Sequence, residues 1–336
     1  MSIIPPSFPA DLLDRPFTVD GPDAFNALAL DLFHLHARHN PIYRAYLDAL
    51  RMNPALVTDA TLIPALPIGL FKNHRILLDG LESPLRFTSS GTTGPVTSTH
   101  HVPWPALYER SFMTSFRAVY GDPATWRILA PLPAYLERSG SSLVYMAEQL
   151  IRASGDPLSG TYLHDLEALA TVIVRSEREG KKTLLLGVPF ALLDLAEKHP
   201  MPLRHTTIME TGGMKGRRPE IVREELHRIL MDTFEVPAIH SEYGMTELLS
   251  QGWSTGHGNY RCPPWMRIRL RDPNDPFNHI GPGRTGGIDV FDLANVGSCP
   301  FIATQDLGRL NADGSFEVLG RFDHSDQRGC NLLVEV

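Results

Sequence analysis

Four short segments, each rich in side chains that can bind phosphate, sugar or metal, follow one another along this chain. The first contains hydroxyl and glycine residues only, namely Thr88, Ser89, Ser90, Gly91, Thr92, Thr93 and Gly94. The others are Tyr243-Gly244-Met245-Thr246-Glu247, Thr304-Gln305-Asp306-Leu307-Gly308 and Gly320-Arg321-Phe322-Asp323. Each string alone also occurs in ordinary loops, so it is their order that predicts a single site.

The run at 88–94 is suited to bind phosphate groups. Glycine permits the positive φ values that turn backbone N–H groups toward one point, and the hydroxyls donate further hydrogen bonds. The run is not a Walker A loop, because Pro95 follows Gly94 and no lysine lies between Lys72 and Lys181. The structural alternative is a polar turn after a strand at 85–87.

The second segment follows a predicted strand and would lie at its carboxyl end, where open α/β sheets bind ligands. The ring of Tyr243 can stack on a purine, the Thr246 hydroxyl can reach an α-phosphate, and Glu247 can hold Mg²⁺. The alternative is a strand-to-helix turn in which Thr246 caps the helix and Glu247 lies in its first turn.

Asp306 and Arg321 belong to the last two segments. A carboxylate after an extended run is suited to accept both hydroxyls of a ribose, although an Asp beside Gly in a β-turn is the commoner meaning of such a string. Arg321 and Asp323 can equally form a solvated surface pair, which contributes under about 1 kcal/mol. The paired His100 and His101 are weak candidates for acid–base groups, because the chain has 14 histidines.

A fifth polar segment, at 211–218, contains Gly212, Gly213, Lys215 and Arg217. The glycines allow the backbone to lie flat against an adenine ring, and the cations favour a triphosphate. The alternative is a loop that ends in a basic, solvated helix start.

The elements expected to position these segments form an α/β body followed by a β-rich part. Helical patterns at 143–153, 163–178 and 220–234 alternate with short apolar runs at 183–187, 206–209 and 237–240, which predicts a largely parallel sheet. Short β-like runs follow at 267–271, 286–293, 301–305 and 316–321. Ahead of them, two helices joined at Asn40-Pro41 and an extended segment at 63–72 are expected.

Bulk composition narrows the functional class. With 336 residues and 43% hydrophobic side chains, the chain can bury a large core. A net charge of −7 without a basic run argues against a nucleic-acid partner. The absence of a signal-like start or a membrane-spanning apolar run predicts a cytoplasmic protein, and Cys262, Cys299 and Cys330 match neither a disulfide framework nor a zinc site.

The four segments in this order resemble the adenylate-forming superfamily of acyl-CoA synthetases, luciferases and peptide-synthetase adenylation domains. Longer segments at 63–72, 214–218, 241–251, 262–266 and 304–331 are similar to its acyl-protein synthetase branch, the LuxE-type ligases of bacterial luminescence. The resemblance implies an α/β fold with a β-rich lobe and without the mobile C-terminal lid domain. The implied division is a helical segment at 1–80, an adenylation core at 81–260, a β-rich lobe at 261–322 and a hinge-like tail at 323–336.

The resemblance also implies the reaction. An acid and MgATP would give an acyl-adenylate and pyrophosphate, and the acyl group would pass to a cysteine and then to a reductase partner, with an acyltransferase as a further possible partner. Residues 88–94 would hold the triphosphate, Asp306 the ribose and Glu247 the magnesium. The rest of the nucleotide would be bound by Gly212, Gly213, Glu242, Tyr243, Gly244, Met245, Thr246 and Arg321.

Cys330 lies where this branch carries its acylated cysteine. Its position near the carboxyl end, beside Arg328, suits a mobile thiolate, although a buried structural cysteine is an equal alternative. Without a lid lysine, Lys215 and Arg217 are the candidates to offset charge in the transition state. Long-chain, short-chain and aryl acids all fit the sequence, as do coenzyme A or a carrier protein as acceptor, and a nucleotide-binding scaffold without turnover.

Overall fold

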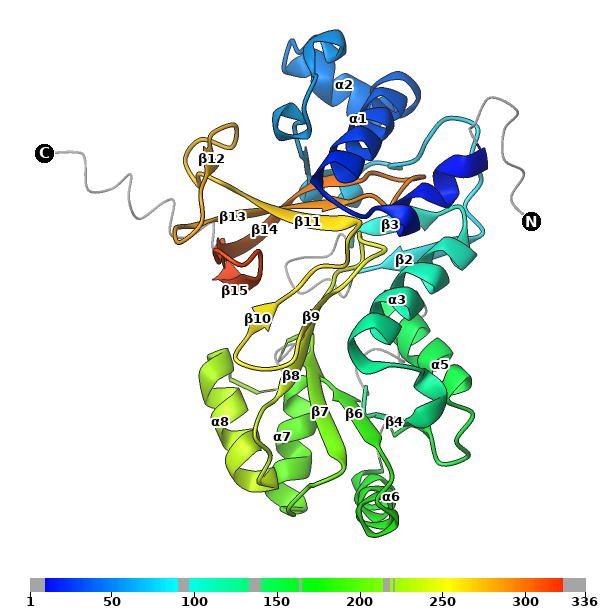
Figure 1. Cartoon of the computed structure of the whole chain (residues 1–336), viewed down its shortest axis with the longest axis vertical. Helices are drawn as coiled ribbons and strands as arrows, with labels where there is room; N and C mark the ends of the chain where they lie inside the picture. The colour runs from blue at the N-terminus through cyan, green and yellow to red at the C-terminus, as the bar shows by residue number, and fades with distance from the viewer. Residues whose placement is uncertain are drawn as a thin grey trace, which may run out of the picture.

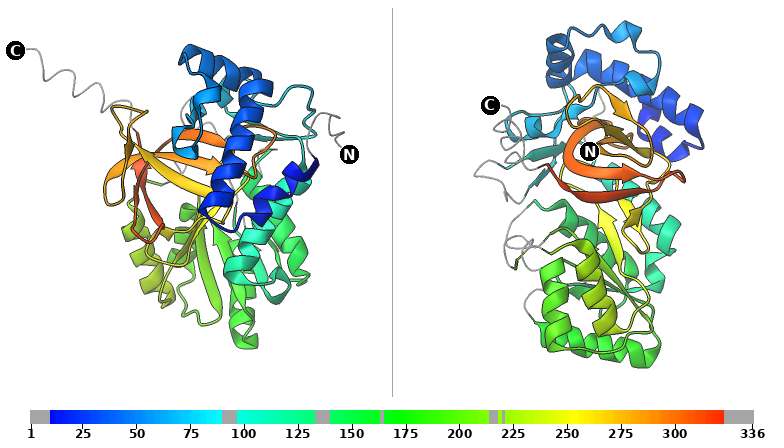
Figure 2. Two further views of the ribbon diagram at one scale, coloured as in Figure 1. Left: turned by 45° about the horizontal axis from the view of Figure 1, so that its top comes forward. Right: turned by 90° about the vertical axis from the view of Figure 1, so that its left-hand side faces the viewer.

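The computed structural model describes residues 10–89, 97–132, 140–162, 165–213, 218–219 and 221–322. Two sheets lie one above the other along the longest axis of the molecule, an α/β part below and a β-rich part above, with α1 and α2 at the far end of the β-rich part (Figures 1 and 2). The helices are α1 (Pro22–His39), α2 (Pro41–Ala49), α3 (Pro105–Tyr120), α5 (Ser142–Ser154), α6 (Leu166–Glu179), α7 (Pro189–Lys198) and α8 (Arg223–Phe234).

The lower sheet has the order β5-β4-β6-β7-β8-β9. Its strands are β4 (Arg127–Ala130), β5 (Gly160–Thr161), β6 (Thr183–Gly187), β7 (Thr206–Thr211), β8 (His240–Tyr243) and β9 (Gly252–Ser254). All neighbours are parallel except β8 and β9. The apolar runs at β6 and β7 are buried on both faces, as helix-covered parallel strands require.

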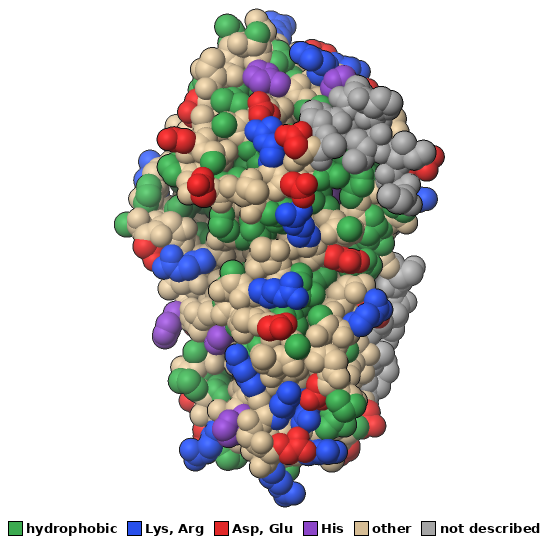
Figure 3. Space-filling view, turned by 45° about the vertical axis from the view of Figure 1, so that its right-hand side comes forward, with side chains coloured by type: hydrophobic (Ala, Val, Ile, Leu, Met, Phe, Trp, Pro, Cys, Tyr) green, Lys and Arg blue, Asp and Glu red, His purple; other side chains and the backbone are tan. Residues whose placement is uncertain are grey.

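The upper sheet has the order β10-β15-β14-β13-β11-β12, and β1 pairs in parallel with β14. Its strands are β1 (Leu66–Pro67), β10 (Asn259–Tyr260), β11 (Met266–Arg271), β12 (His279–Ile280), β13 (Thr285–Asp292), β14 (Phe301–Leu310) and β15 (Phe316–Arg321). A separate antiparallel hairpin consists of β2 (Leu85–Thr88) and β3 (Thr99–Val102). Charged side chains of both signs are interspersed on the face shown in Figure 3.

Most elements expected from the sequence are present, and the exceptions have local causes. The run at 237–240 was expected to be a strand, but β8 begins only at His240, after Pro237, which has no N–H to donate to a ladder. The segment at 63–72 is extended only through β1 and then forms a 3₁₀ helix at Ile68–Lys72. Three elements, α3, β4 and α7, have no counterpart among those expected from the sequence.

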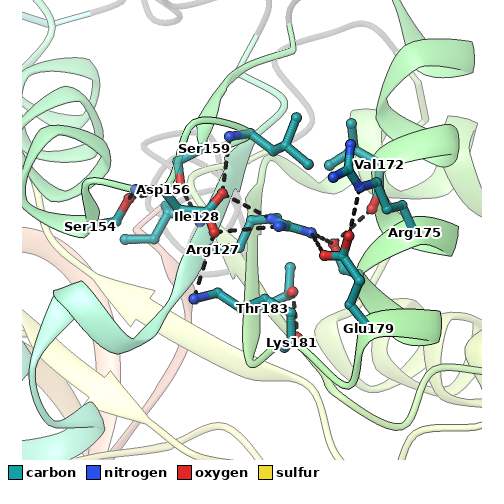
Figure 4. Close-up of polar contacts among 12 residues, drawn as sticks. Arg127, Ile128, Ser154, Asp156, Ser159, Val172, Arg175, Glu179, Lys181 and Thr183 are labelled. Carbon is teal, nitrogen blue, oxygen red and sulfur yellow. Dashed lines mark hydrogen bonds and ion pairs between the residues drawn. The ribbon is translucent and has the colours of Figure 1, made fainter.

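A network of ion pairs between side chains lies at the amino-terminal edge of the lower sheet (Figure 4). Arg127, at the start of β4, is 5% exposed and lies 3.0 Å from Asp156 and 3.1 Å from Glu179. It also donates to the Ser176 hydroxyl at 2.8 Å. Because strand carboxyl ends lie at the opposite edge, this network holds the sheet together away from the predicted site.

Among the described helices, none combines the length and apolar character needed to cross a lipid bilayer.

Candidate functional site

Asp306 connects the two sheets at the carboxyl end of β8. The Tyr243 hydroxyl, from the lower sheet, donates to Asp306 Oδ2 at 2.9 Å, and Arg321 Nε lies 3.2 Å from Asp306 Oδ1. Asp306 and Arg321 are paired residues of β14 and β15. Burial and the neighbouring Asp306 carboxylate raise the pKa of Tyr243, so its hydroxyl stays protonated and remains a donor.

The ring of Tyr243 is enclosed by other aromatic rings. Its centroid lies 5.4 Å from that of Phe316 and 5.9 Å from that of Tyr260, and the residue is 7% exposed. The described contacts of Tyr243 therefore position Asp306. Stacking of the Tyr243 ring on adenine stays a prediction.

Thr246 and Glu247 form a turn that leads to β9 and not to a helix. The alternative in which Thr246 is a helix N-cap is therefore wrong. Two buried side chains fix the turn: His100 Nδ1 lies 2.8 Å from the Thr246 carbonyl oxygen, and the Asn295 amide donates to the Glu247 carbonyl at 2.9 Å. His100 Nε2 lies 3.1 Å from Asn295 Oδ1, and burial lowers the pKa of His100 to about 4, so its ring is neutral at pH 7.

The β2–β3 hairpin brings both ends of the segment at 90–96 to this turn. The Ser89 N–H donates to the Ser98 carbonyl at 3.0 Å, and the Ser98 N–H donates to the Ser89 hydroxyl at 2.9 Å. The Ser98 side chain lies near the Glu247 carboxylate, which is 4% exposed, and burial raises the pKa of Glu247. Ser89, which belongs to the predicted phosphate-binding run, and Ser98, which follows it, thus lie near the predicted magnesium ligand.

A second polar pair lies on the opposite face of β8. Thr211, the last residue of β7, donates to Glu242 Oε2 at 2.5 Å. Burial raises the pKa of Glu242 to about 7. Gly212 follows with a φ of 76°, which glycine adopts without strain, and Gly213 continues the chain.

The structure therefore brings together several of the predicted residues, namely Thr88, Ser89, Tyr243, Gly244, Met245, Thr246, Glu247, Asp306 and Arg321. Others lie outside the described residues: Ser90, Gly91, Thr92, Thr93, Gly94, Lys215, Arg217 and Cys330. Sequence reasoning missed Ser98 and Asn295 and gave His100 no place in the turn. Only His100 and Ser98 had a signal, their position just after the predicted phosphate-binding run.

Within the described ranges, no group of three or more His, Cys, Asp and Glu side chains forms a metal cluster. A nucleotide-bound Mg²⁺ does not need one, because it is held by one or two carboxylates together with phosphate oxygens and water. Glu247, a carboxylate beside Ser98, which follows the predicted phosphate-binding run, fits that arrangement.

The two described cysteines are poor nucleophiles. Burial raises the pKa of Cys299 to about 12 and that of Cys262 further, so both thiols stay protonated at neutral pH.

The sequence matches no family model and no curated protein. Solved structures do match the fold. A 2-hydroxyisobutyryl-CoA ligase in complex with 2-HIB-AMP and CoA is 13% identical, with a TM-score of 0.66 over 90% of this chain and 70% of the ligase. ATP-bound MatB from Rhodopseudomonas palustris is 18% identical, with a TM-score of 0.54 over 73% of this chain and 49% of MatB.

O-succinylbenzoate coenzyme A synthetase (MenE) from Bacillus subtilis, in complex with ATP and magnesium, is 20% identical, with a TM-score of 0.50 over 70% of this chain and 49% of MenE. The chain thus spans about half the length of MatB and MenE. These likenesses confirm the expected fold: a mixed α/β chain with the fold of the N-terminal domain of adenylate-forming enzymes.

Proposed function

We propose that this protein activates a carboxylic acid with MgATP. The observation that carries the proposal is the convergence of the Tyr243–Glu247 segment, Asp306 and the ends of the 90–96 segment at one junction between the two sheets. Fold alone does not define an activity. The support for this one is that carboxylate, hydroxyl and guanidinium groups suited to bind a nucleotide lie near one another at this junction.

Each group has a role in this reaction. Asp306 accepts the ribose hydroxyls, Thr246 donates to the α-phosphate, and Glu247 holds the Mg²⁺ that offsets phosphate charge. A carboxylate oxygen of the acid attacks the α-phosphorus, the bond to the bridging oxygen breaks, and pyrophosphate leaves. Lys215, Arg217 and Arg321 supply the positive charge that stabilises this transition state.

Acid-dependent ATP–pyrophosphate exchange tests the proposal. Labelled pyrophosphate should enter ATP only when a suitable acid is present, because exchange requires reversible adenylate formation. Thr246→Val should lower the exchange rate about 100-fold through loss of one transition-state hydrogen bond. Thr61→Val, which removes an exposed hydroxyl that bonds Asp59, is the matched control. A broad acid panel that gives no exchange would exclude adenylation.

The acyl acceptor proposed first is Cys330, as in the LuxE-type acyl-protein synthetases that the sequence resembles. Its thiolate would attack the acyl-adenylate carbonyl and release AMP, and the thioester would then deliver a fatty acyl group to a reductase partner. Cys330→Ser should keep exchange and lose hydroxylamine-labile acyl label on the protein, whereas Cys262→Ser should keep both. Undiminished labelling of Cys330→Ser would exclude this cysteine.

Coenzyme A is the second candidate acceptor. It is favoured because two of the solved proteins with a similar fold are a CoA ligase and a coenzyme A synthetase. Rapid acyl-CoA formation without labelled protein would select this alternative. Tight ATP binding without acid-dependent turnover, with a reductase supplied, would instead indicate a nucleotide-binding scaffold.

A further inference from the structure

Three polar side chains, those of Thr211, Glu242 and Gln251, lie on one face of the lower sheet, opposite to the face of Tyr243. Thr211 pairs in register with Glu242 on the parallel strand. Tyr243 pairs with Gly252 of β9, and the next residues along, Gly244 and Gln251, lie close to one another. Since strand residues alternate between faces, Glu242 and Gln251 share a face, and Tyr243 belongs to the other.

Contacts with helices on the two sides support this assignment. Ser241, on the face of Tyr243, lies 3.5 Å from His227 of α8. His240, on the face of Glu242, bonds Tyr120 of α3 at 3.1 Å, and Trp253, which pairs with Glu242, donates to Ser115 of α3 at 3.1 Å. Glu242 therefore faces α3, on the side of β8 away from Asp306.

The polar atoms of this group have unused capacity to accept hydrogen bonds. Gln251 is 4% exposed, and its Oε1 is buried without a hydrogen-bond partner. Glu242 Oε2 accepts from Thr211, and Glu242 Oε1 lies over Gly244, 2.2 Å from where a Cβ would stand. The same Cβ position is 3.4 Å from Gln251 Cγ, so the Glu242 and Gln251 side chains lie close together over Gly244. Burial, with a smaller contribution from the nearby Glu210 carboxylate, also raises the pKa of Glu242 to about 7.

We infer that Glu242, Gln251 and Thr211 bind a hydroxyl or amino group carried by the acid substrate. The inference rests on the proposed activation reaction, in which the nucleotide occupies the Asp306 side and the acid approaches the α-phosphate from another direction. An unsubstituted acyl chain here would leave buried acceptors without partners, which is costly, whereas a hydroxyl or amino group supplies the missing donor. The substrate class is thus an acid, fatty or otherwise, that carries a hydroxyl or amino group.

Exchange kinetics with matched acids test this inference. Benzoate and hexanoate are compared with their monohydroxy and monoamino derivatives. For at least one derivative of the series, wild-type kcat/KM should exceed that of the parent acid by about 100-fold or more, as in sites built around a substrate hydroxyl. Glu242→Met should reduce this preference at least tenfold, while Glu148→Gln, an exposed residue of α5, should leave it unchanged.

The variant Glu242→Gln distinguishes an amino donor on the substrate from a hydroxyl donor, because it removes the charge of Glu242 but keeps the shape of the side chain. An amino substrate should lose most of its advantage in this variant because the charge pair is gone, whereas a hydroxyl substrate should keep most of it. Exchange that is as fast with the unsubstituted acids, or a preference that survives Glu242→Met, would overturn the inference and leave acid activation standing. Absence of exchange with every acid would overturn both.

Discussion

Asp306 shows how one carboxylate depends on two sheets. Its position in β14 gives it the partner Arg321 on β15, and the fold adds Tyr243 from β8. The two oxygens are held by different partners, and each keeps lone-pair capacity for a ribose hydroxyl. The carboxylate is therefore oriented before any nucleotide binds, which lowers the entropy cost of binding.

Asp306→Asn should weaken ATP binding about 10- to 100-fold, because charged hydrogen bonds are worth about 1.5–3 kcal/mol. Calorimetric titration with MgATP gives the affinity. Glu317→Gln is a matched control, since Glu317 and Arg309 form a similar pair at 2.7 Å across the same two strands. Equal affinities of the two variants would show that Asp306 does not bind the nucleotide.

At the scale of single elements, buried His36 connects α1 by a hydrogen bond to the loop after β13, which also carries Asn295. Its Nε2–H donates to the Val296 carbonyl at 2.9 Å, and its Nδ1 accepts from Asn40 at 3.2 Å. Asn40 caps α2 and also donates to the Ser298 carbonyl at 2.7 Å. The two helices are thereby fixed to the loop that carries Asn295.

Burial lowers the pKa of His36 to about 3, so the folded chain binds fewer protons than the unfolded chain between that value and about 6.5. The free energy of unfolding should therefore fall as pH decreases through this window. Between about pH 7.5 and 4.5, wild type should lose about 2 to 3 kcal/mol more than His36→Gln, which keeps a donor at the same place.

Urea unfolding at both pH values measures this difference. The exposed His74→Gln variant should follow wild type. Parallel pH profiles of wild type and His36→Gln would contradict the assignment of a neutral His36.

Arg127, at the start of β4 and far from the candidate site, is a buried charged side chain that pairs with two carboxylates. Arg127→Met leaves Asp156 and Glu179 without their shared partner, which should cost about 3–5 kcal/mol of unfolding free energy. Arg175→Met, in the same network but 62% exposed, should cost under about 1 kcal/mol. Denaturant titration of both variants tests the contrast, and similar losses would show that burial does not govern this network.

At the scale of the whole molecule, three distant parts of the chain meet at Asn295. The hairpin contributes His100, the turn after β8 contributes Thr246 and Glu247, and the loop after β13 contributes Asn295 itself, which is 1% exposed. A small displacement of any one part would move the Thr246 hydroxyl relative to Asp306.

Asn295→Ala should lower kcat for exchange about 10- to 100-fold, because a shift of about 1 Å in a positioned group can cost that much. The KM for ATP should change less, since Asp306 keeps both partners. Asn311→Ala, which removes an amide contact to Asn259 at 3.2 Å, is the control. An unchanged kcat would mean that the turn holds its position without Asn295.

Local patterns in the sequence determined much of this architecture. The runs at 183–187 and 316–321 are strands with those bounds, and the break at Asn40-Pro41 separates two helices, because apolar periodicity and proline act over a few residues. The order of the polar segments likewise predicted that Tyr243, Asp306 and Arg321 lie together.

The tertiary structure alone decided how these residues face one another. Tyr243 and Glu242 are neighbours in sequence, yet alternation along β8 points one at Asp306 and the other at α3. Nothing near Asn295 in the sequence predicts its contact with Glu247, and the position of Ser98 just after the run at 88–94 does not predict its partner. These contacts join residues 149 positions apart for Ser98 and 48 positions apart for Asn295. Hydrogen bonds between such distant residues depend on how the two sheets pack, which no local pattern encodes.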